Sequence, residues 1–232
     1  MKYVIQSCSS RLWYVQNFLV PDMLSQGIKE SDICVLNDDD SLGCLWHYIR
    51  TCEIVLRKYP NEPGVWRLQD DVLISSTFKE ATEAAPKDIV CNGYLATEES
   101  DDYDKVGLVA VKDYWYSFPC IYVPNEITRG FLEWFKYKVV REGKHSKQLQ
   151  KRKYDDYFFW LSMQAQRKDA LILNMYPNII QHVDYLLNGS VVNQKRKAGK
   201  AKAYYWLETE REEELAQRIA KWKNNRDMEQ IQ

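Results

Sequence analysis

The chain has 232 residues, of which 45% are hydrophobic and 13% aromatic, enough to fill the core of one domain. Its formal net charge of -1 hides two short basic runs and several acidic segments, so local charge matters more than the total. No apolar run reaches the roughly 18 to 20 residues that span a bilayer, and the polar residues 6–11 argue against a signal peptide. We therefore expect a cytoplasmic protein without a membrane partner, with one domain over residues 1–207 and a charged helix and tail over 208–232.

Strands and helices alternate in the first part of the chain. Apolar runs predict strands at residues 3–5, 32–36 and 65–68, and helical spacing predicts helices at 11–26 and 42–59. A polar turn follows each strand, and the third turn carries Gln69, Asp70 and Asp71. Alternation of this kind predicts an α/β fold with a mostly parallel central sheet flanked by helices. In such sheets the ligand crevice lies beyond the carboxyl ends of the strands, where all three turns are expected to meet.

The second half of the chain is less regular. Its predicted strands cover residues 89–94, 108–111 and 170–175, and its predicted helices cover 124–140, 155–167 and 208–232. The last of these helices is highly charged. We detect no internal repeat.

Two short motifs suggest chemistry. Leu68-Gln69-Asp70-Asp71-Val72 places two carboxylates at the end of an apolar strand, and carboxylate oxygens are ligands for Mg²⁺ or Mn²⁺. Pro177-Asn178-Ile179-Ile180-Gln181-His182-Val183 places one histidine just past a strand. Taken singly, an aspartate pair also suits a solvated turn, and a lone histidine also suits a packed loop.

Together and in this order, the two motifs resemble those of the GT-A class of glycosyltransferases. Residues 68–72 resemble the L-E-D-D-V/I form of the D-x-D motif in lipooligosaccharide-type and branching N-acetylglucosaminyltransferases. Residues 177–183 resemble the P-S-L-x-Q-H-V/I stretch of the branching enzymes. The resemblance covers roughly residues 3–205 in outline, and Gln69 departs from it because those relatives usually carry an acidic residue there. It implies a single GT-A (Rossmann-like) domain.

The resemblance also implies a reaction. A sugar would pass from a nucleoside-diphosphate sugar, most simply a UDP-sugar, to an acceptor hydroxyl with Mn²⁺ or Mg²⁺ as cofactor. The departing diphosphate gains negative charge, which a bridging divalent cation stabilises. Asp71 is then the direct metal ligand and His182 a second ligand from the other side of the site. Asp70 belongs to the same metal site and holds the donor ribose or a bridging water.

Further donor-binding residues follow from their position in the GT-A outline. Ser7 and Arg11 lie at the first turn, Asp38 to Asp40 at the second, and Gln69 at the third. Lys195 and Arg196 belong to a basic segment that we expect to close over the diphosphate. The aspartates of the second turn equally suit the start of a helix, where acidic residues face the positive end of the helix dipole. The basic segment equally suits a solvated loop.

The catalytic base and the acceptor site are assigned in the same way. Inverting GT-A enzymes generally place a carboxylate near a helix start, which makes Asp156 the first choice of base and Asp155 the second. Helix capping is the alternative role for both residues. The aromatic residues Tyr114, Trp115 and Tyr116 suit stacking on an acceptor, and they equally suit core packing.

Two basic runs, at residues 144–153 and 195–202, contain no acidic residue and suggest a polyanionic acceptor. One form of it is a hydroxymethylated base in DNA, as for some bacteriophage-type glycosyltransferases, and such a base would have to be presented or flipped. A saccharide or polysaccharide acceptor fits the sequence equally well. Two other function classes stay open: a non-catalytic nucleic-acid-binding module, and a nucleotidyltransferase, which also needs paired carboxylates and a metal.

Overall fold

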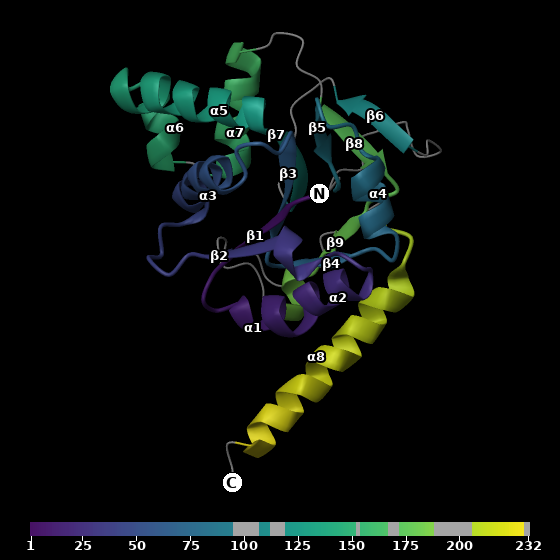
Figure 1. Ribbon diagram of the computed structural model, residues 1–232. Coiled ribbons are helices and arrows are strands. Elements are labelled where there is room, and N and C mark those ends of the chain that lie inside the picture. The colour runs from purple at the N-terminus through teal and green to yellow at the C-terminus, as the bar shows by residue number, and fades with distance from the viewer. Residues whose placement is uncertain (95–106, 112–118, 152–153, 167–171, 188–205, 230–232) are drawn as a thin grey trace.

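A seven-stranded sheet lies between two layers of helices in the computed structural model, which describes residues 1–94, 107–111, 119–151, 154–166, 172–187 and 206–229 (Figure 1). In spatial order its strands are β2 (Ile33–Asn37), β1 (Tyr3–Ser7), β3 (Gly64–Gln69), β7 (Cys120–Pro124), β5 (Val90–Asn92), β8 (Ile172–Tyr176) and β6 (Gly107–Val111). Of these seven, β6 and β7 run opposite to the other five. The predicted α/β fold, with a mostly parallel sheet flanked by helices and a charged C-terminal helix, is confirmed.

The first three strands line up their carboxyl ends at one edge of the sheet. In the parallel pairs, Ser7 of β1 lies opposite Asn37 of β2, and Gln6 lies opposite Gln69 of β3. All five residues of β1 are buried, as expected for a strand covered on both faces. The three polar turns that follow these strands therefore leave the sheet side by side.

One face of the sheet is covered by α3 (Cys44–Lys58), α5 (Asn125–Trp134) with its π-helical extension η3 (Phe135–Arg141), and α7 (Asp155–Gln166). A short helix, α6 (Ser146–Lys151), precedes α7. The rings of Tyr48, Phe131 and Phe159 pack together here, with centroids 5.5 to 6.3 Å apart. Edge-to-face and tilted contacts of this kind stabilise the layer beyond simple burial.

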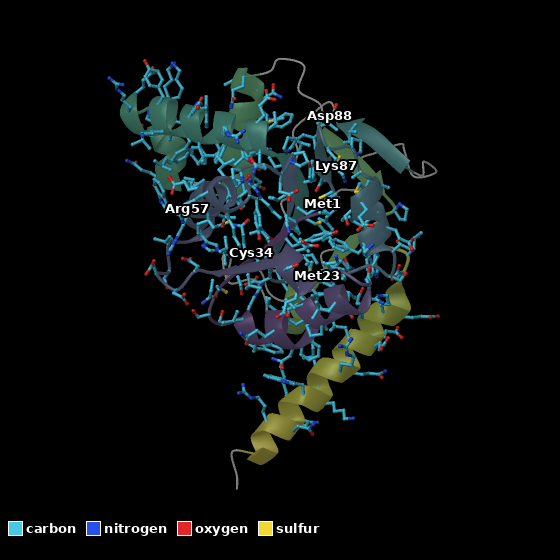
Figure 2. The ribbon with its side chains drawn as sticks, in the orientation of Figure 1. Met1, Met23, Cys34, Arg57, Lys87 and Asp88 are labelled. Atoms are coloured by element: carbon cyan, nitrogen blue, oxygen red, sulfur yellow. The ribbon has the colours of Figure 1, made fainter. Side chains whose placement is uncertain are left out.

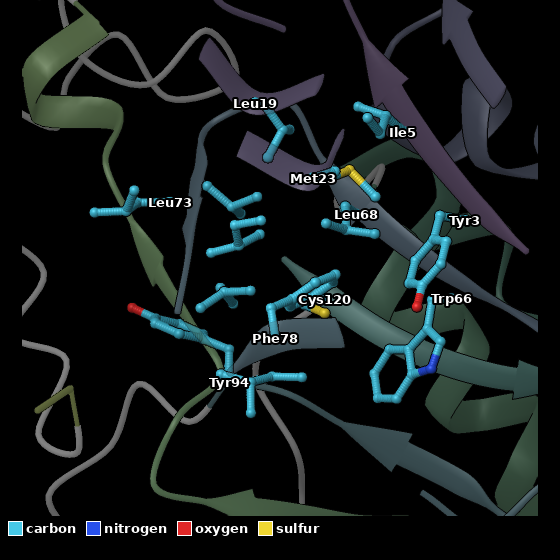
Figure 3. Close-up of a cluster of buried hydrophobic side chains, with 14 of the residues drawn as sticks. Tyr3, Ile5, Leu19, Met23, Trp66, Leu68, Leu73, Phe78, Tyr94 and Cys120 are labelled. Carbon is cyan, nitrogen blue, oxygen red and sulfur yellow. The ribbon is translucent and has the colours of Figure 1, made fainter. Parts of the chain in front are cut away.

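The other face carries a continuous helical stretch, formed by α1 (Leu12–Tyr14), the π-helical η1 (Val15–Leu19) and α2 (Val20–Ser25), together with α4 (Phe78–Ala84). A two-stranded antiparallel sheet, β4 (Val72–Ile74) with β9 (Ile180–His182), packs in the same layer. Figure 3 shows the shared core, in which Leu19 and Met23 lie with Leu68 while Phe78 lies close to Cys120. Two short 3-10 turns, η2 (Glu30–Asp32) and η4 (Asp184–Leu187), complete the described elements.

Helix α8 (Thr209–Glu229) begins against this second layer and then extends away from it (Figures 1 and 2). Leu215 and Ile219 are buried in the core, and the Trp222 ring stacks on Trp13 with centroids 4.6 Å apart. None of the described helices combines the length and the apolar character needed to cross a membrane. The limits predicted at residues 207 and 208 for the domain and the C-terminal helix stay a prediction.

Several elements differ from the sequence expectations. Residues 120–124 form the antiparallel strand β7, which was not predicted. The sequence predicted that a helix begins at residue 124, and α5 begins one residue later. Strands β4 and β9 and helix α4 were not predicted, because three-residue strands and a seven-residue helix are too short to show a period.

Candidate active site

The turns after β1, β2 and β3 are joined by hydrogen bonds at the carboxyl edge of the sheet. The backbone N–H of Cys8 donates to Asp70 Oδ2 at 2.8 Å, which links the first turn to the third. The backbone N–H of Asp38 donates to the carbonyl of Ser7 at 2.8 Å, which links the second turn to the first. The expected meeting of the three turns is therefore present in the structure.

Asp70 and Asp71 both contact the buried guanidinium group of Arg11. The Arg11 guanidinium Nη1 donates to Asp71 Oδ2 and lies 3.4 Å from Asp70 Oδ1. All three side chains are buried, with 4% to 7% of each residue exposed. Arg11 is held in place by its own backbone N–H, which donates to the carbonyl of Cys8 at 2.9 Å.

The short sheet of β4 and β9 brings His182 to Asp71, although the two residues are far apart in the sequence. Val72 lies opposite His182 in this sheet, and the backbone N–H of Val183 donates to the Asp71 carbonyl at 2.8 Å. The imidazole Nε2 then lies 3.1 Å from Asp71 Oδ2. Its other nitrogen, Nδ1, lies 3.6 Å from Asp184 Oδ1, so carboxylates flank both sides of the ring.

The pKa values in this cluster move in opposite directions. Burial and the charge of Asp71 raise the pKa of Asp70 to about 6, against the opposing effect of Arg11. Burial alone would also raise the pKa of Asp71, but His182 and Arg11 outweigh it and hold that pKa well below its ordinary value. Burial lowers the pKa of His182, but Asp71 and Asp184 outweigh it, so the net shift is upward. Asp71 is therefore the carboxylate of the pair that stays ionised at neutral pH.

One oxygen of the cluster could serve as a ligand for a divalent cation. Asp71 Oδ1 is buried and has no hydrogen-bond partner among the described residues, which leaves one carboxylate oxygen available as a ligand. Carboxylate oxygens are the ligands that Mg²⁺ and Mn²⁺ prefer. Within the described ranges no group of three or more His, Cys, Asp or Glu side chains is arranged as a metal site. Asp71 and His182 would then act as the two protein ligands, with phosphate and water oxygens in the other positions.

Asp155 and Asp156 open α7 at the same edge of the sheet. Asp155 is buried and accepts a hydrogen bond at 2.9 Å from the thiol of Cys44, the first residue of α3. Asp156 is partly exposed, and its Oδ1 accepts the backbone N–H of Tyr157 at 2.6 Å. Burial and the charge of Asp155 raise the pKa of Asp156 to about 7, and burial raises the pKa of Asp155 as well.

The other predicted donor residues have different surroundings. Ser7 is buried at the end of β1, where its hydroxyl donates to the Cys8 carbonyl at 3.3 Å, and Gln69 is half-buried at the end of β3. The Asp38 carboxylate accepts the backbone N–H groups of residues 42 and 43 at 2.8 and 2.9 Å and so shapes the turn before α3. Asp40 lies on the surface and pairs with Arg50 at 2.6 Å. No hydrogen bond or ion pair between described residues joins Asp40 to the Asp71 cluster.

Several predicted residues lie outside the described part of the chain. These are the acceptor residues Tyr114, Trp115 and Tyr116, the donor residues Lys195 and Arg196, and the basic run 195–202. Of the run 144–153, the structure describes residues 144–151, which include α6, and Lys144 and Lys147 are exposed.

Sequence reasoning missed two residues beside the site. Asp184 faces His182 Nδ1, and its place only two residues after the histidine was the available signal. Cys44 donates to Asp155 across 111 residues of sequence, and no local pattern indicates that contact. Both residues contact side chains that the sequence predicted for the site, namely His182 and Asp155.

Comparisons with known proteins give matches among solved structures. No protein-family model and no curated protein sequence matches the chain. Among solved structures, one similar chain is a glycosyltransferase involved in the glycosylation of the major capsid of PBCV-1, with a TM-score of 0.36 and 13% identity. The match covers 58% of the present chain and 66% of that chain, just under two thirds of its length.

Proposed function

We propose that this protein is a metal-dependent glycosyltransferase that moves a sugar from a nucleoside-diphosphate sugar to an acceptor hydroxyl with inversion. The observation that carries the proposal is the meeting of Asp71 and His182, with Asp70 and Arg11 beside them, at the carboxyl edge of the sheet. This edge is where open α/β sheets bind ligands. A UDP-sugar is the proposed donor, and Mn²⁺ or Mg²⁺ the proposed cofactor.

Each residue of the cluster has a task in donor binding. Asp71 and His182 would hold the cation, which when bound neutralises charge on the departing diphosphate. Asp70 accepts hydrogen bonds and suits the donor ribose or a bridging water. The Arg11 guanidinium contacts both carboxylates and can donate charge-assisted hydrogen bonds to phosphate oxygens. Ser7 and Gln69 border the same edge, on the nucleoside side.

Asp156 is proposed as the base. The acceptor oxygen forms a bond to the anomeric carbon while the bond from that carbon to the diphosphate oxygen breaks, and the hydroxyl proton passes to the Asp156 carboxylate. Asp156 suits this role better than Asp155, because it is partly exposed whereas Asp155 is buried and accepts a hydrogen bond from the Cys44 thiol. A pKa of about 7 lets Asp156 accept a proton at neutral pH.

The proposed acceptor is a polyanion, with a hydroxymethylated base in DNA as its first form. Supporting this choice, the exposed Lys144 and Lys147 lie just before and within α6, which directly precedes the helix that Asp155 opens. Lysines that contact phosphates give binding that weakens as salt rises. Screening hydroxymethylated DNA against simple saccharides identifies the acceptor class, and transfer to saccharides alone contradicts the DNA form.

The donor reaction itself can be tested with a panel of nucleotide-sugars and an assay for nucleoside-diphosphate release. Release should require Mn²⁺ or Mg²⁺, stop with a chelator, and fall by about 100-fold or more in Asp71→Asn, because charge stabilisation at the diphosphate is lost. Release of pyrophosphate would instead indicate a nucleotidyltransferase. Absence of nucleotide-sugar binding under all of these conditions would leave the nucleic-acid-binding module as the better account.

A further inference from the structure

The positively charged side chain of Arg11 lies against the aspartate oxygens that would attract a metal cation. Its guanidinium donates to Asp71 Oδ2, the same oxygen that lies 3.1 Å from His182 Nε2, and it also lies 3.4 Å from Asp70 Oδ1. The Arg11 residue is only 4% exposed, so water screens this charge weakly. A full positive charge is thus built into the site.

We propose that Arg11 is a resident counter-ion of Asp71, which a divalent cation must displace and which turns to the diphosphate when the nucleotide binds. This inference rests on the proposed function and adds an order of binding to it. Two positive groups on one carboxylate repel each other strongly in a buried site. The cation alone is therefore a poor competitor, whereas a diphosphate brings enough negative charge for both groups.

The arrangement differs from a purely structural ion pair. A structural pair of buried charges is stable when additional hydrogen bonds satisfy the remaining lone pairs. Here Asp71 Oδ1 is buried without a hydrogen-bond partner among the described residues, although Arg11 contacts the neighbouring oxygen. The pair leaves half of the carboxylate unused, as suits a partner that is exchanged during binding.

Arginine is well suited to bind the diphosphate after it leaves Asp71. Its planar guanidinium binds phosphate oxygens through two parallel hydrogen bonds, whereas lysine offers a compact point charge. The backbone of Arg11 stays fixed by its bond to the Cys8 carbonyl, and Cys8 is itself bonded to Asp70. Only the side chain then needs to move between the carboxylates and the phosphates.

The direct test measures Mn²⁺ binding in the absence of nucleotide. The electron paramagnetic resonance signal of the free ion reports how much Mn²⁺ is bound. Arg11→Met should bind Mn²⁺ at least about tenfold more tightly than the unchanged protein, because the competing charge is gone. Arg11→Lys keeps the charge and should stay near the unchanged protein. Adding Asp71→Asn to Arg11→Met should abolish the gain. Unchanged or weaker Mn²⁺ binding in Arg11→Met, or a gain that survives Asp71→Asn, overturns the inference.

A second measurement uses the unchanged protein and decides the matter if Arg11→Met does not fold. Thermal unfolding is followed with Mn²⁺ alone, UDP alone and both together, since a bound ligand raises the unfolding temperature. Both together should raise it by more than the sum of the separate shifts. A shift with Mn²⁺ alone as large as the shift with both contradicts the exchange. Failure of the transferase assay with this synergy intact would count against the proposed function and leave the role of Arg11 standing.

Discussion

Two pairs of adjacent aspartates lie at the same edge of the sheet, and their surroundings give them different chemistry. Asp71 is in contact with Arg11 and His182, which hold its pKa low and keep it ionised. Asp156 is next to the buried Asp155, and the pKa of Asp156 rises to about 7 through burial and that neighbouring charge. Carboxylates whose pKa values are driven apart in this way suit separate tasks, here cation binding and proton transfer.

The raised pKa of Asp156 predicts the pH dependence of turnover. A base must be deprotonated, so at saturating donor and metal the turnover number should fall about tenfold per pH unit below about 7 and level off above it. Asp156→Asn should lower the turnover number by about 100-fold or more while donor binding is retained, because a base acts only in the chemical step. The measurement is the pH profile of the turnover number, with donor affinity determined in parallel.

Asp155→Asn is the matched control for that profile. It removes the neighbouring negative charge and keeps an oxygen to accept the Cys44 thiol. The acid limb of the profile should therefore move to lower pH, because the pKa of Asp156 falls. Collapse of turnover in Asp155→Asn, with normal turnover in Asp156→Asn, would instead give the role of base to Asp155.

At the scale of elements, β3 is joined to two helices through one buried cation. Arg67 is 1% exposed and donates to the Tyr48 hydroxyl at 2.7 Å and the Cys52 sulfur at 3.0 Å on α3. Its other terminal nitrogen donates to Thr128 Oγ1 on α5 at 2.6 Å. Partners for both terminal nitrogens offset much of the cost of burying this charge, so the network fixes the helix layer against the sheet.

Thr128→Val should lower the free energy of unfolding by about 1.5 to 3 kcal/mol, since it removes an acceptor from a buried charge without changing side-chain size. Thr51→Val is the matched control: Thr51 is equally buried, on α3, and its hydroxyl has no hydrogen-bond partner among the described residues. That substitution should be neutral or stabilising. Urea unfolding midpoints give both values, and equal losses in the two variants would contradict this role of the Arg67 network.

Elements with a clear period could be predicted from the sequence. Strands β1, β2 and β3 and helices α3 and α7 lie within one or two residues of their predicted limits, because each carries an unbroken apolar pattern. Strand β7 escaped prediction because its apolar run leads directly into α5 through Pro124. Its antiparallel pairing with β3 depends on long-range contacts that no local pattern specifies.

In the candidate site, too, local sequence patterns could be predicted and long-range contacts could not. The sequence predicted that Asp71 and His182 lie together only through a resemblance of two motifs, since nothing local links residues so far apart. The structure brings them together by pairing β4 with β9. The sequence predicted that the turn of Arg11 would meet the turn of the aspartates, but the ion pair between their side chains was not predicted, because Arg11 was assigned only to donor binding.

At the scale of the whole molecule, His182 is positioned by the close packing of the residue after β5 against the residue before β9. A side-chain carbon added to Gly93 would lie 2.7 Å from Ile179 Cγ1, so only glycine allows this approach without a shift. The backbone N–H of Ile179 donates to the Gly93 carbonyl at 3.0 Å, and the backbone N–H of Ser75 donates to Ile179 at 2.9 Å. These bonds tie β5, β9 and the end of β4 together, which brings the second motif to the first.

The most direct test of this account is whether Asp71 and His182 act on one ion. Mn²⁺ affinity in the presence of UDP would be measured by titration calorimetry for the unchanged protein, Asp71→Asn, His182→Gln and the double variant. Each single change should weaken binding by about 10- to 100-fold, and the double variant should be little worse than the poorer single one, because both remove the same site. Full affinity in either single variant, or losses that multiply in the double variant, would contradict the shared site.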